Sequence, residues 1–583
     1  MTTNVSEPPQ PARGEYTRRR AARERRADDL ARRYERVTRA WKNVRLLITA
    51  VIWEEVNMRL HLGVLLLLGG LAALMVVLIL WAARVHNARR RALRSAAYYD
   101  RRLTVLDGDW PGRGETGRRY LDPKHPCAAD LDLFGDASLY ELLCTARTRA
   151  GQDALAGWLL HPALPPEVRR RQAAVAALRD QLDLREDLDL IGGEVRSGDE
   201  RAAFGAWAVQ PTWPGLAAAR GLAGVVAVFV AVAVVAACVT GRPEPILVVL
   251  SVAALTAVGL RHRVRAALAP IEPYAGAVAV YADLLTCWER AGVGAAFGPE
   301  PLRRLARLLS RLRTAPVAAP VLCLTRLALA IEVWRRRHGD RLADWLDAAG
   351  RAEALCGLAT YAYENPADPF PELAEAGPSY EGEGLAHPLL PSGRCVPNDM
   401  ALGGGPRLLV VSGCNMSGKS TLLRTVGVNA VLALAGAPVR ATRLRLSPFA
   451  IGATLRVQDS LQRGQSRFFA EITRLRQILD LAKGEAPVLF LLDELLSGTN
   501  SEDRRAGAAA VLRKLVDAGA VGLVTTHDLA LTPIADELGP AGGNVHFADR
   551  LEDGRLVFDY RMRPGVVRQR NALALMRSVG IDV

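Results

Sequence analysis

The fold is decided by the stretch LLVVSGCNMSGKST, residues 408–421, in the last third of the chain. Its first five residues are a short apolar run typical of a buried strand, and the helical sequence LLRTVGVNAVLAL follows the loop. The loop fits GxxxxGKS, in which backbone N–H groups surround phosphates and the helix N-terminus adds its dipole. The sequence therefore predicts an α/β nucleotide-binding domain with a phosphate loop.

The loop predicts ATP and Mg²⁺ as cofactors. Lys419 would reach the β- and γ-phosphates, and Ser420 would place its hydroxyl on Mg²⁺. The residues expected to contact the nucleotide are Gly413, Asn415, Met416, Ser417, Gly418, Lys419, Ser420 and Thr421.

Two further apolar runs are followed by acidic or histidine side chains. The run 488–492 leads to Asp493 and Glu494, and the run 521–525 leads to His527. We expect Asp493 to hold Mg²⁺, Glu494 to polarise the attacking water, and His527 to sense the γ-phosphate. The alternative, a strand that ends in a solvated acid pair, is disfavoured by the phosphate loop upstream.

With these motifs, the chain resembles the MutS family. GCNMSGKST (413–421) is similar to that family's GPNMGGKST loop, with Cys414 where proline is usual. LLDELLSGTNSEDR (491–504) resembles DEIGRGTSTYDG, and TTHDLAL (525–531) resembles the family's ATH loop. The resemblance implies ATP hydrolysis by a homodimer.

A fourth motif, GQSRFFAE (464–471), resembles the family's GRSTFMVE segment. By that resemblance Ser466 would meet the γ-phosphate bound to the other subunit. The resemblance extends upstream to LDLFGDASLYELL (131–143) and downstream to FDY (558–560), so it covers most of residues 120–583. It includes no mismatch-recognition domain before residue 120 and no Smr-like nuclease domain after the ATPase, which places the chain nearest to the membrane-associated MutS-like proteins. DNA binding, as in the mismatch repair relatives, is an open option.

Three apolar segments predict membrane spans. Leu62 to Ala83 carries no charge and is long enough to cross a bilayer. Gly221–Val239 and Ile246–Leu260 read as a hairpin with arginines at both ends, although a buried core hairpin is the alternative. We therefore expect a multi-pass protein of the cell membrane with its ATPase domain in the cytoplasm.

The side of the membrane on which the N-terminus lies stays open. Residues 1–60 carry 14 Lys and Arg, and residues 84–119 carry ten, so both flanks of the first span are drawn to the cytoplasmic side. A re-entrant pair, in which residues 41–53 enter the membrane beside the first span, would place both flanks on the cytoplasmic side.

The composition is compatible with this organisation. There are 75 Lys and Arg against 61 Asp and Glu, which favours anionic partners such as lipid, nucleic acid or nucleotide. The eight cysteines show no CxxC or zinc-type spacing and are expected to be reduced thiols. The cysteines are Cys127, Cys144, Cys238, Cys287, Cys323, Cys356, Cys395 and Cys414.

The expected architecture is mixed: an α-helical core with transmembrane helices, followed by an ABC-like α/β P-loop domain. The expected segments are a basic tail (1–61), a transmembrane helix (62–83), the first part of the core (84–220), a transmembrane hairpin (221–260), a helical core or lever (261–400) and the ATPase domain (401–583). An ABC-type transporter subunit is the alternative function, but the chain has GQSRFFAE where LSGGQ would stand. A tether that binds ATP without hydrolysis is disfavoured by Glu494.

Overall fold

The computed structural model describes residues 11–55, 62–193, 200–210, 216–292, 298–314, 321–375, 377–455, 467–496, 501–552 and 555–567. The chain forms two compact units, Met1–Trp110 and Pro111–Val583. Each unit is described by itself below.

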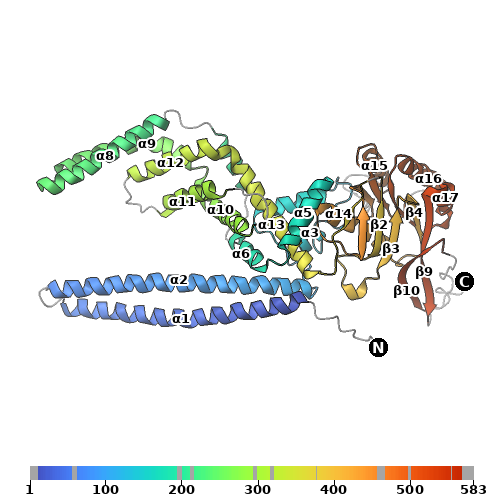
Figure 1. The fold of residues 1–583 in the computed structure, drawn as a ribbon, viewed down its shortest axis with the longest axis horizontal. Coiled ribbons are helices and arrows are strands. Elements are labelled where there is room, and N and C mark those ends of the chain that lie inside the picture. The colour runs from blue at the N-terminus through green and yellow to red at the C-terminus, as the bar shows by residue number, and fades with distance from the viewer. Residues whose placement is uncertain are drawn as a thin grey trace. The chain divides into compact units, whose positions relative to one another are not determined.

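The first unit is an antiparallel pair of long helices, α1 (Pro11–Glu55) and α2 (Leu62–Leu106) (Figure 1). Tyr16 and Tyr99 are fully buried between them, with ring centroids 5.8 Å apart. Two ion pairs also join the helices: Arg20 lies 3.0 Å from Asp100, and Arg13 lies beside Asp107. The segment expected to be a basic tail is therefore largely one helix packed on its neighbour.

The apolar half of α2 faces outward. Leu66 is 69% exposed and Val77 is 59% exposed, and the expected boundary at residue 83 falls inside this continuous helix. Within the described residues, the stretch Gly63–Leu106 is the one helical segment long and apolar enough to cross a membrane. The expectation of several transmembrane helices is therefore not supported.

The expected hairpin at 221–260 is present as two helices, α8 (Leu216–Thr240) and α9 (Glu244–Leu268), which pack on each other and on α12 (Val321–His338). Their apolar stretches, Gly224–Thr240 and Glu244–Thr256, are shorter than a typical span. Many of their side chains are exposed, such as Phe229 and Leu255, so the pair is not a buried core hairpin.

Most of the remaining helices of the core contact α13. They are α3 (Leu139–Leu143), α4 (Arg149–Leu160), α5 (Pro165–Leu178), α6 (Leu182–Gly192), α7 (Glu200–Ala208), α10 (Ala275–Arg290), α11 (Glu300–Thr314) and α13 (Leu342–Glu364). Helix α13 approaches α4 closely, because a Cβ on Gly350 would lie 2.5 Å from the carbonyl oxygen of Ala150. The buried carboxylate of Glu353 accepts hydrogen bonds from the N–H groups of Arg147 and Thr148, which satisfies donors at the start of α4.

A four-stranded sheet follows α13 and corrects the expectation that residues 261–400 are helical throughout. Its strands are β1 (Glu372–Leu373), β2 (Tyr380–Leu385), β3 (Asn398–Leu402) and β5 (Arg443–Leu446), in the order β1-β5-β2-β3. Strand β2, with the sequence YEGEGL, alternates polar residues with small or apolar ones, which suits a half-buried strand better than a helix.

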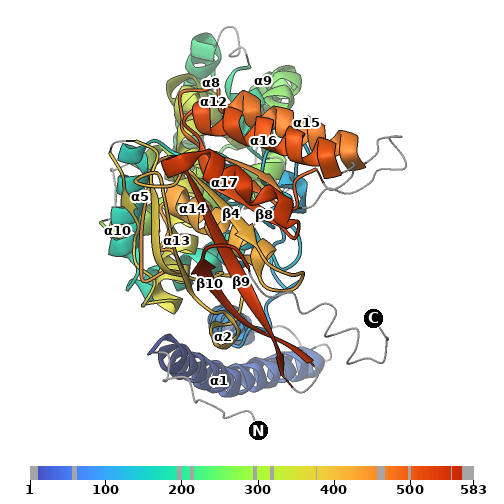
Figure 2. The same cartoon turned by 90° about the vertical axis from the view of Figure 1, so that its right-hand side faces the viewer.

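The second sheet is the mostly parallel sheet of an α/β domain, as predicted from the sequence. It contains β4 (Leu408–Ser412), β6 (Ala450–Thr454), β7 (Val488–Leu492), β8 (Val521–Thr526), β9 (Gly542–Glu552) and β10 (Arg555–Pro564). The order is β10-β9-β4-β8-β7-β6, with all neighbours parallel except β10 and β9. Figure 2 shows β9 and β10 side by side. The helices of this region are α14 (Lys419–Ala435), α15 (Arg467–Leu481), α16 (Ser501–Asp517) and α17 (Pro533–Glu537). Since β4, β8 and β7 are neighbours, the residues that follow them meet at one edge of the sheet.

Candidate active site

The phosphate loop joins the buried strand β4 to helix α14, as the sequence predicts. Gly418 caps the helix with φ +104°, and Gly413 has φ +150°. A Cβ on Gly413 would lie 2.9 Å from Ser417 Oγ and 3.0 Å from the carbonyl oxygen of Phe547, so only glycine fits there. The backbone is thus free to curl tightly, which is what binding of phosphate by N–H groups requires.

Lys419 is buried at the first position of α14. Its Nζ donates hydrogen bonds to the carbonyl oxygens of Gly413 at 2.9 Å and Cys414 at 2.8 Å. Burial lowers the pKa of Lys419, while Glu494 and Asp493 act in the opposite direction. The ammonium group is therefore held inside the loop that would surround the phosphates.

Ser417 supports the fit of a phosphate-bearing ligand. Its side chain is 1% exposed, and its hydroxyl has no hydrogen-bond partner among the described residues. A buried hydroxyl without a partner costs free energy. A ligand oxygen in the loop would supply the missing partner.

The two acidic residues follow β7 directly. The N–H of Asp493 donates to the carbonyl oxygen of Thr454 at 2.9 Å, and the hydroxyl of Thr525 donates to Asp493 Oδ1. The N–H of Glu494 donates to the same Thr525 hydroxyl at 3.1 Å. Glu494 has φ +48°, an uncommon value for a residue other than glycine, and such values concentrate at functional sites.

His527 follows β8 and lies beside Glu494. Its Nδ1 is 3.2 Å from Glu494 Oε1, and both side chains are partly exposed. The sequence places these two residues after different strands, and in the structure their side chains are in contact. The pair can hold a proton between an imidazole nitrogen and a carboxylate oxygen.

The residues expected to hold Mg²⁺ have suitable chemistry. Ser420 lies in the first turn of α14, and Asp493 lies at the end of β7, separated from β4 only by β8. Mg²⁺ prefers oxygen ligands and usually takes one or two from the protein, with water and phosphate completing the set. No cluster of three or more acidic, histidine or cysteine side chains suited to a metal occurs among the described residues, and a site shared with nucleotide does not need one.

Three other predicted contacts are exposed: Asn415 and Met416 in the loop, and Thr421 on α14. Met416 is 85% exposed and has φ +71°. Ser466 lies outside the described residues.

Sequence reasoning missed several residues that support the acidic pair. Besides Thr525, the buried carboxylate of Glu471 accepts a hydrogen bond from the N–H of Leu496, which has φ +54°. Arg504 Nε donates to the carbonyl oxygen of Leu495 at 3.1 Å. Thr525 could have been found from its place in TTH, directly before the third motif. Nothing in the sequence indicates the contact of Glu471, because it joins residues 25 positions apart.

Helix α15 also connects this site to the helical core. Arg474 Nη1 donates to the carbonyl oxygen of His125 at 2.6 Å, and Nη2 donates to that of Pro123 at 3.1 Å. Asp130 in the same core segment accepts a hydrogen bond from the N–H of Leu455, just after β6. The helix that carries Glu471 is thus fixed to both the site and the core.

The cysteine in the phosphate loop is partly buried. Burial raises the pKa of Cys414, with Asp549 as the next contributor. The described cysteines are all free thiols, as expected.

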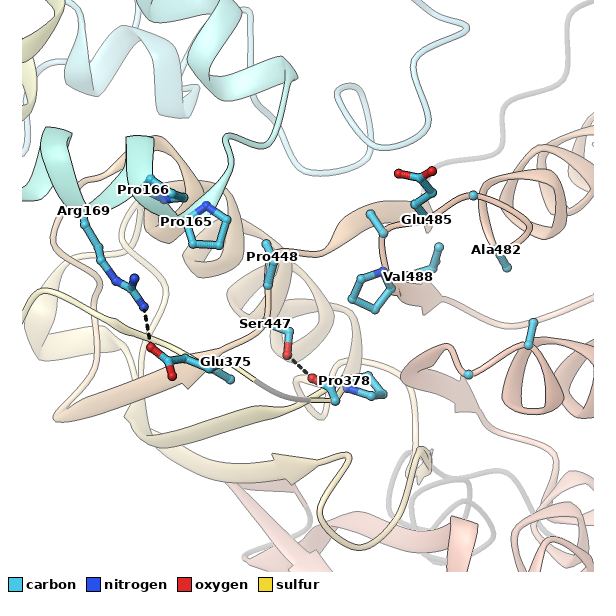
Figure 3. Close-up of a pocket in the computed structure, with 17 residues that line it drawn as sticks. Pro165, Pro166, Arg169, Glu375, Pro378, Ser447, Pro448, Ala482, Glu485 and Val488 are labelled. Atoms are coloured by element: carbon cyan, nitrogen blue, oxygen red, sulfur yellow. Dashed lines mark hydrogen bonds and ion pairs between the residues drawn. The ribbon is translucent and has the colours of Figure 1, made fainter.

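A pocket of about 610 Å³ lies away from this site, where the strands β6, β7 and β8 begin (Figure 3). This end of the sheet is remote from the phosphate loop. Arg169 and Glu375 form an exposed ion pair of 3.1 Å beside the pocket, and Ser447 Oγ donates to the carbonyl oxygen of Gly377 at 2.6 Å. Prolines make up much of its wall, and none of the predicted site residues lines it.

Comparison with known proteins identifies the C-terminal region. Residues 409–582 match the family model of MutS domain V. The matched region contains the phosphate loop, the acidic pair and His527. It also contains β10, one of the two edge strands of the second sheet.

Curated relatives are similar to part of the chain. The chain is 36% identical over 252 residues to the DNA mismatch repair protein MutS 2 of Halobacterium salinarum, which covers 42% of this chain and 29% of the relative. It is 34% identical over 206 residues to the Endonuclease MutS2 of Thermus thermophilus, covering 35% of this chain and 27% of the relative. The matches support membership of the MutS family and give no support to the transporter alternative. The chain spans less than a third of the length of these relatives.

Proposed function

We propose that this chain, whose C-terminal region is a MutS domain V, is a Mg²⁺-dependent ATPase that works as a homodimer at a membrane. The proposed ATPase activity rests on one observation: three functional side chains follow three neighbouring strands of the second sheet. Lys419 is buried in the phosphate loop after β4, Glu494 follows β7, and His527 follows β8 within 3.2 Å of Glu494.

Each residue has a definite task in hydrolysis. Lys419 neutralises phosphate charge, and Glu494 accepts a proton from the attacking water. His527 orients the Glu494 carboxylate and contacts the γ-phosphate. Ser420 and Asp493 would hold Mg²⁺, which would neutralise part of the phosphate charge.

The dimer is proposed from the resemblance of residues 464–471 to the MutS segment. Ser466 of one subunit would complete the site formed by Lys419 of the other. The N–H of Leu496 donates a hydrogen bond to the buried carboxylate of Glu471, which holds the helix that follows Ser466 beside the segment after the acidic pair.

Attachment to a membrane is proposed from two exposed apolar regions. The 22 residues from Leu62 to Ala83 would extend about 33 Å as a helix, close to the thickness of a bilayer core. The α8–α9 pair has no charged residue in 221–241 or 245–260. The charged residues lie at the turn between the two helices and at the opposite end of the pair, where they would contact water or lipid headgroups. We place the ATPase region on the cytoplasmic side.

The pairing of α1 with α2 restricts how α2 can be inserted. Contacting residues have numbers that add up to about 115 to 120, as in Tyr16 with Tyr99, Arg20 with Asp100 and Tyr34 with His86. The same register sets Lys42 and Arg45 beside positions 78 and 75, near the middle of the apolar half of α2. A basic residue at the centre of a membrane helix costs about 2.5–3.5 kcal/mol on insertion scales. We therefore expect α1 to separate from this half of α2 if α2 spans the bilayer.

One experiment tests the proposed activity and asks whether DNA is a partner. ATP hydrolysis by the detergent-purified chain would be measured with Mg²⁺, alone and with duplex, mismatched or branched DNA. We expect hydrolysis that needs Mg²⁺. Acceleration by one DNA form would identify it as a partner, whereas equal rates would separate this chain from its mismatch repair relatives. Absence of hydrolysis in all conditions would contradict the proposal.

A second experiment tests the membrane. Full-length chain in isolated membranes should resist extraction by alkaline carbonate, because Leu62–Ala83 is too apolar for a soluble surface. Complete extraction by carbonate would show that the chain is not embedded.

A further inference from the structure

A smaller pocket, of about 290 Å³, lies between the helical core and the ATPase region, and we call it the seam pocket. The core contributes the end of α4 and the segment 125–127, and the ATPase region contributes residues of α14, β6 and α15. Its wall includes Trp158 and Leu160 on the core side, and Val431, Leu434 and Ile451 on the other side. Both sides of the seam pocket are therefore largely apolar.

Polar groups of the segment 125–127 are already used within the protein. His125 Nδ1 accepts a hydrogen bond from the N–H of Ala128 at 3.2 Å, so the ring proton lies on Nε2, which donates to the carbonyl oxygen of Leu160 at 3.1 Å. Burial lowers the pKa of His125, which keeps the ring neutral. The carbonyl oxygen of Pro126 accepts from the N–H of Ala453 at 2.9 Å. These groups offer no further partner to a water molecule in the pocket.

His161 is the polar exception. It follows α4, lines the seam pocket and is exposed, so it lies at the opening of the pocket. Its ring centroid is 6.4 Å from that of His125, and its ring nitrogens have no hydrogen-bond partner among the described residues. A neutral imidazole has one N–H, which His161 can donate to a ligand.

The size and chemistry of the seam pocket select the class of ligand. A buried water needs two to four polar partners, so water is held weakly here and an apolar group gains affinity by displacing it. An apolar cavity of about 150 Å³ can hold one benzene ring, so about 290 Å³ has room for about two rings. A peptide would bring backbone N–H and C=O groups that find few partners against this wall, which is unfavourable.

We propose that the seam pocket binds a small aromatic acid of about two rings. The rings pack against Leu160 of the core and Ile451 of β6, and the carboxylate accepts a hydrogen bond from the His161 ring. Such a ligand would contact the helical core and the ATPase region at once. The inference does not depend on the proposed ATPase function, because the residues of the nucleotide site do not line this pocket.

The test measures binding of 2-naphthoate, an acid with two fused rings, to the full-length chain by equilibrium dialysis. All variants are measured at the same detergent concentration, so that uptake by micelles cancels in the comparison. We expect one saturable site in the wild type. Leu160→Trp and Ile451→Phe fill the pocket from different elements, and each should weaken binding by more than roughly tenfold. Leu164→Trp is the matched control, because Leu164 is 77% exposed outside the pocket, and it should leave affinity unchanged.

Substitutions of His161 test the polar contact without disturbing the core. His161→Ala should weaken binding of 2-naphthoate by roughly tenfold or more, because a hydrogen bond to a charged group is lost. His161→Gln keeps an N–H donor at this position and should retain most of the affinity.

Absence of saturable binding to the wild type would overturn the inference. Equal affinity in the wild type and in folded Leu160→Trp or Ile451→Phe would also overturn it, because the compound would then bind elsewhere. If both of these variants fail to fold, the exposed position 161 decides. Unchanged affinity in His161→Ala would overturn the inference, whereas a loss that His161→Gln restores would support it.

Discussion

Replacing Lys419 by alanine tests the nucleotide site most directly. The ammonium group is buried, and it uses two of its three N–H donors on the carbonyl oxygens of Gly413 and Cys414. Among the described residues this leaves one donor for a phosphate oxygen. Alanine removes the charge and that donor while leaving the helix propensity of the position high.

Two estimates give the size of the effect on ATP affinity. A hydrogen bond to a charged group contributes about 1.5–3 kcal/mol. Opposite unit charges about 4 Å apart attract by about 4 kcal/mol at an effective dielectric constant of about 20. Lys419→Ala should therefore weaken ATP binding by roughly 10- to 1000-fold.

Titration calorimetry with ATP and Mg²⁺ would measure this change, and hydrolysis should be lost in parallel. Lys483→Ala is the matched control, because Lys483 is an exposed lysine paired with Asp480, and its removal should leave affinity unchanged. Binding by Lys419→Ala within about threefold of the wild type, less than about 0.7 kcal/mol, would refute the assignment of the loop.

Glu494→Gln should bind ATP normally but hydrolyse it far more slowly, so that ATP-bound protein accumulates in a filter-binding assay; normal turnover would move the catalytic role to another residue. Lys419→Ala and Ser466→Arg chains should each be inactive alone but regain partial ATPase activity when mixed, because one site of a mixed dimer is intact. No rescue in confirmed mixed dimers, together with no crosslink between positions 419 and 466 of different chains, would argue against a shared site. Burial lowers the pKa of His387 to about 4, below the unfolded value of about 6.5, so the unfolded state binds the extra proton first and stability falls as pH drops from 6.5 toward 4, by up to about 3 kcal/mol. Melting temperatures at pH 7.5 and 5 should show a smaller drop in His387→Gln than in the wild type, and equal drops would assign the pH dependence to other groups.

The parts of the fold that could be predicted from the sequence are those encoded by local pattern. Strands β4 and β7 have the bounds expected from their apolar runs, and β8 extends one residue further than expected. Each of these strands is buried on both faces, so its residues form a continuous apolar run that is easy to recognise. The motif residues that follow them were predictable for the same reason.

The four-stranded sheet was not predictable in this way. Its strand β1 has two residues, and β2 contains two glycines and two glutamates. Strands this short and polar form because β5, which lies 58 residues after β2 in the chain, pairs with β2. Contacts between distant segments also explain why the pairing of α1 with α2 and the contact of Glu471 with Leu496 could not be read from local sequence.

The thiol of Cys414 places a chemically reactive atom within the loop that must close around a phosphate. Its raised pKa keeps it protonated at neutral pH, so it would react only slowly with an alkylating reagent. We expect a triphosphate bound in the loop to hinder the approach of a reagent to this sulfur. The rate of alkylation at residue 414 would therefore report the fraction of time for which the phosphate loop is empty, without any change to the chain.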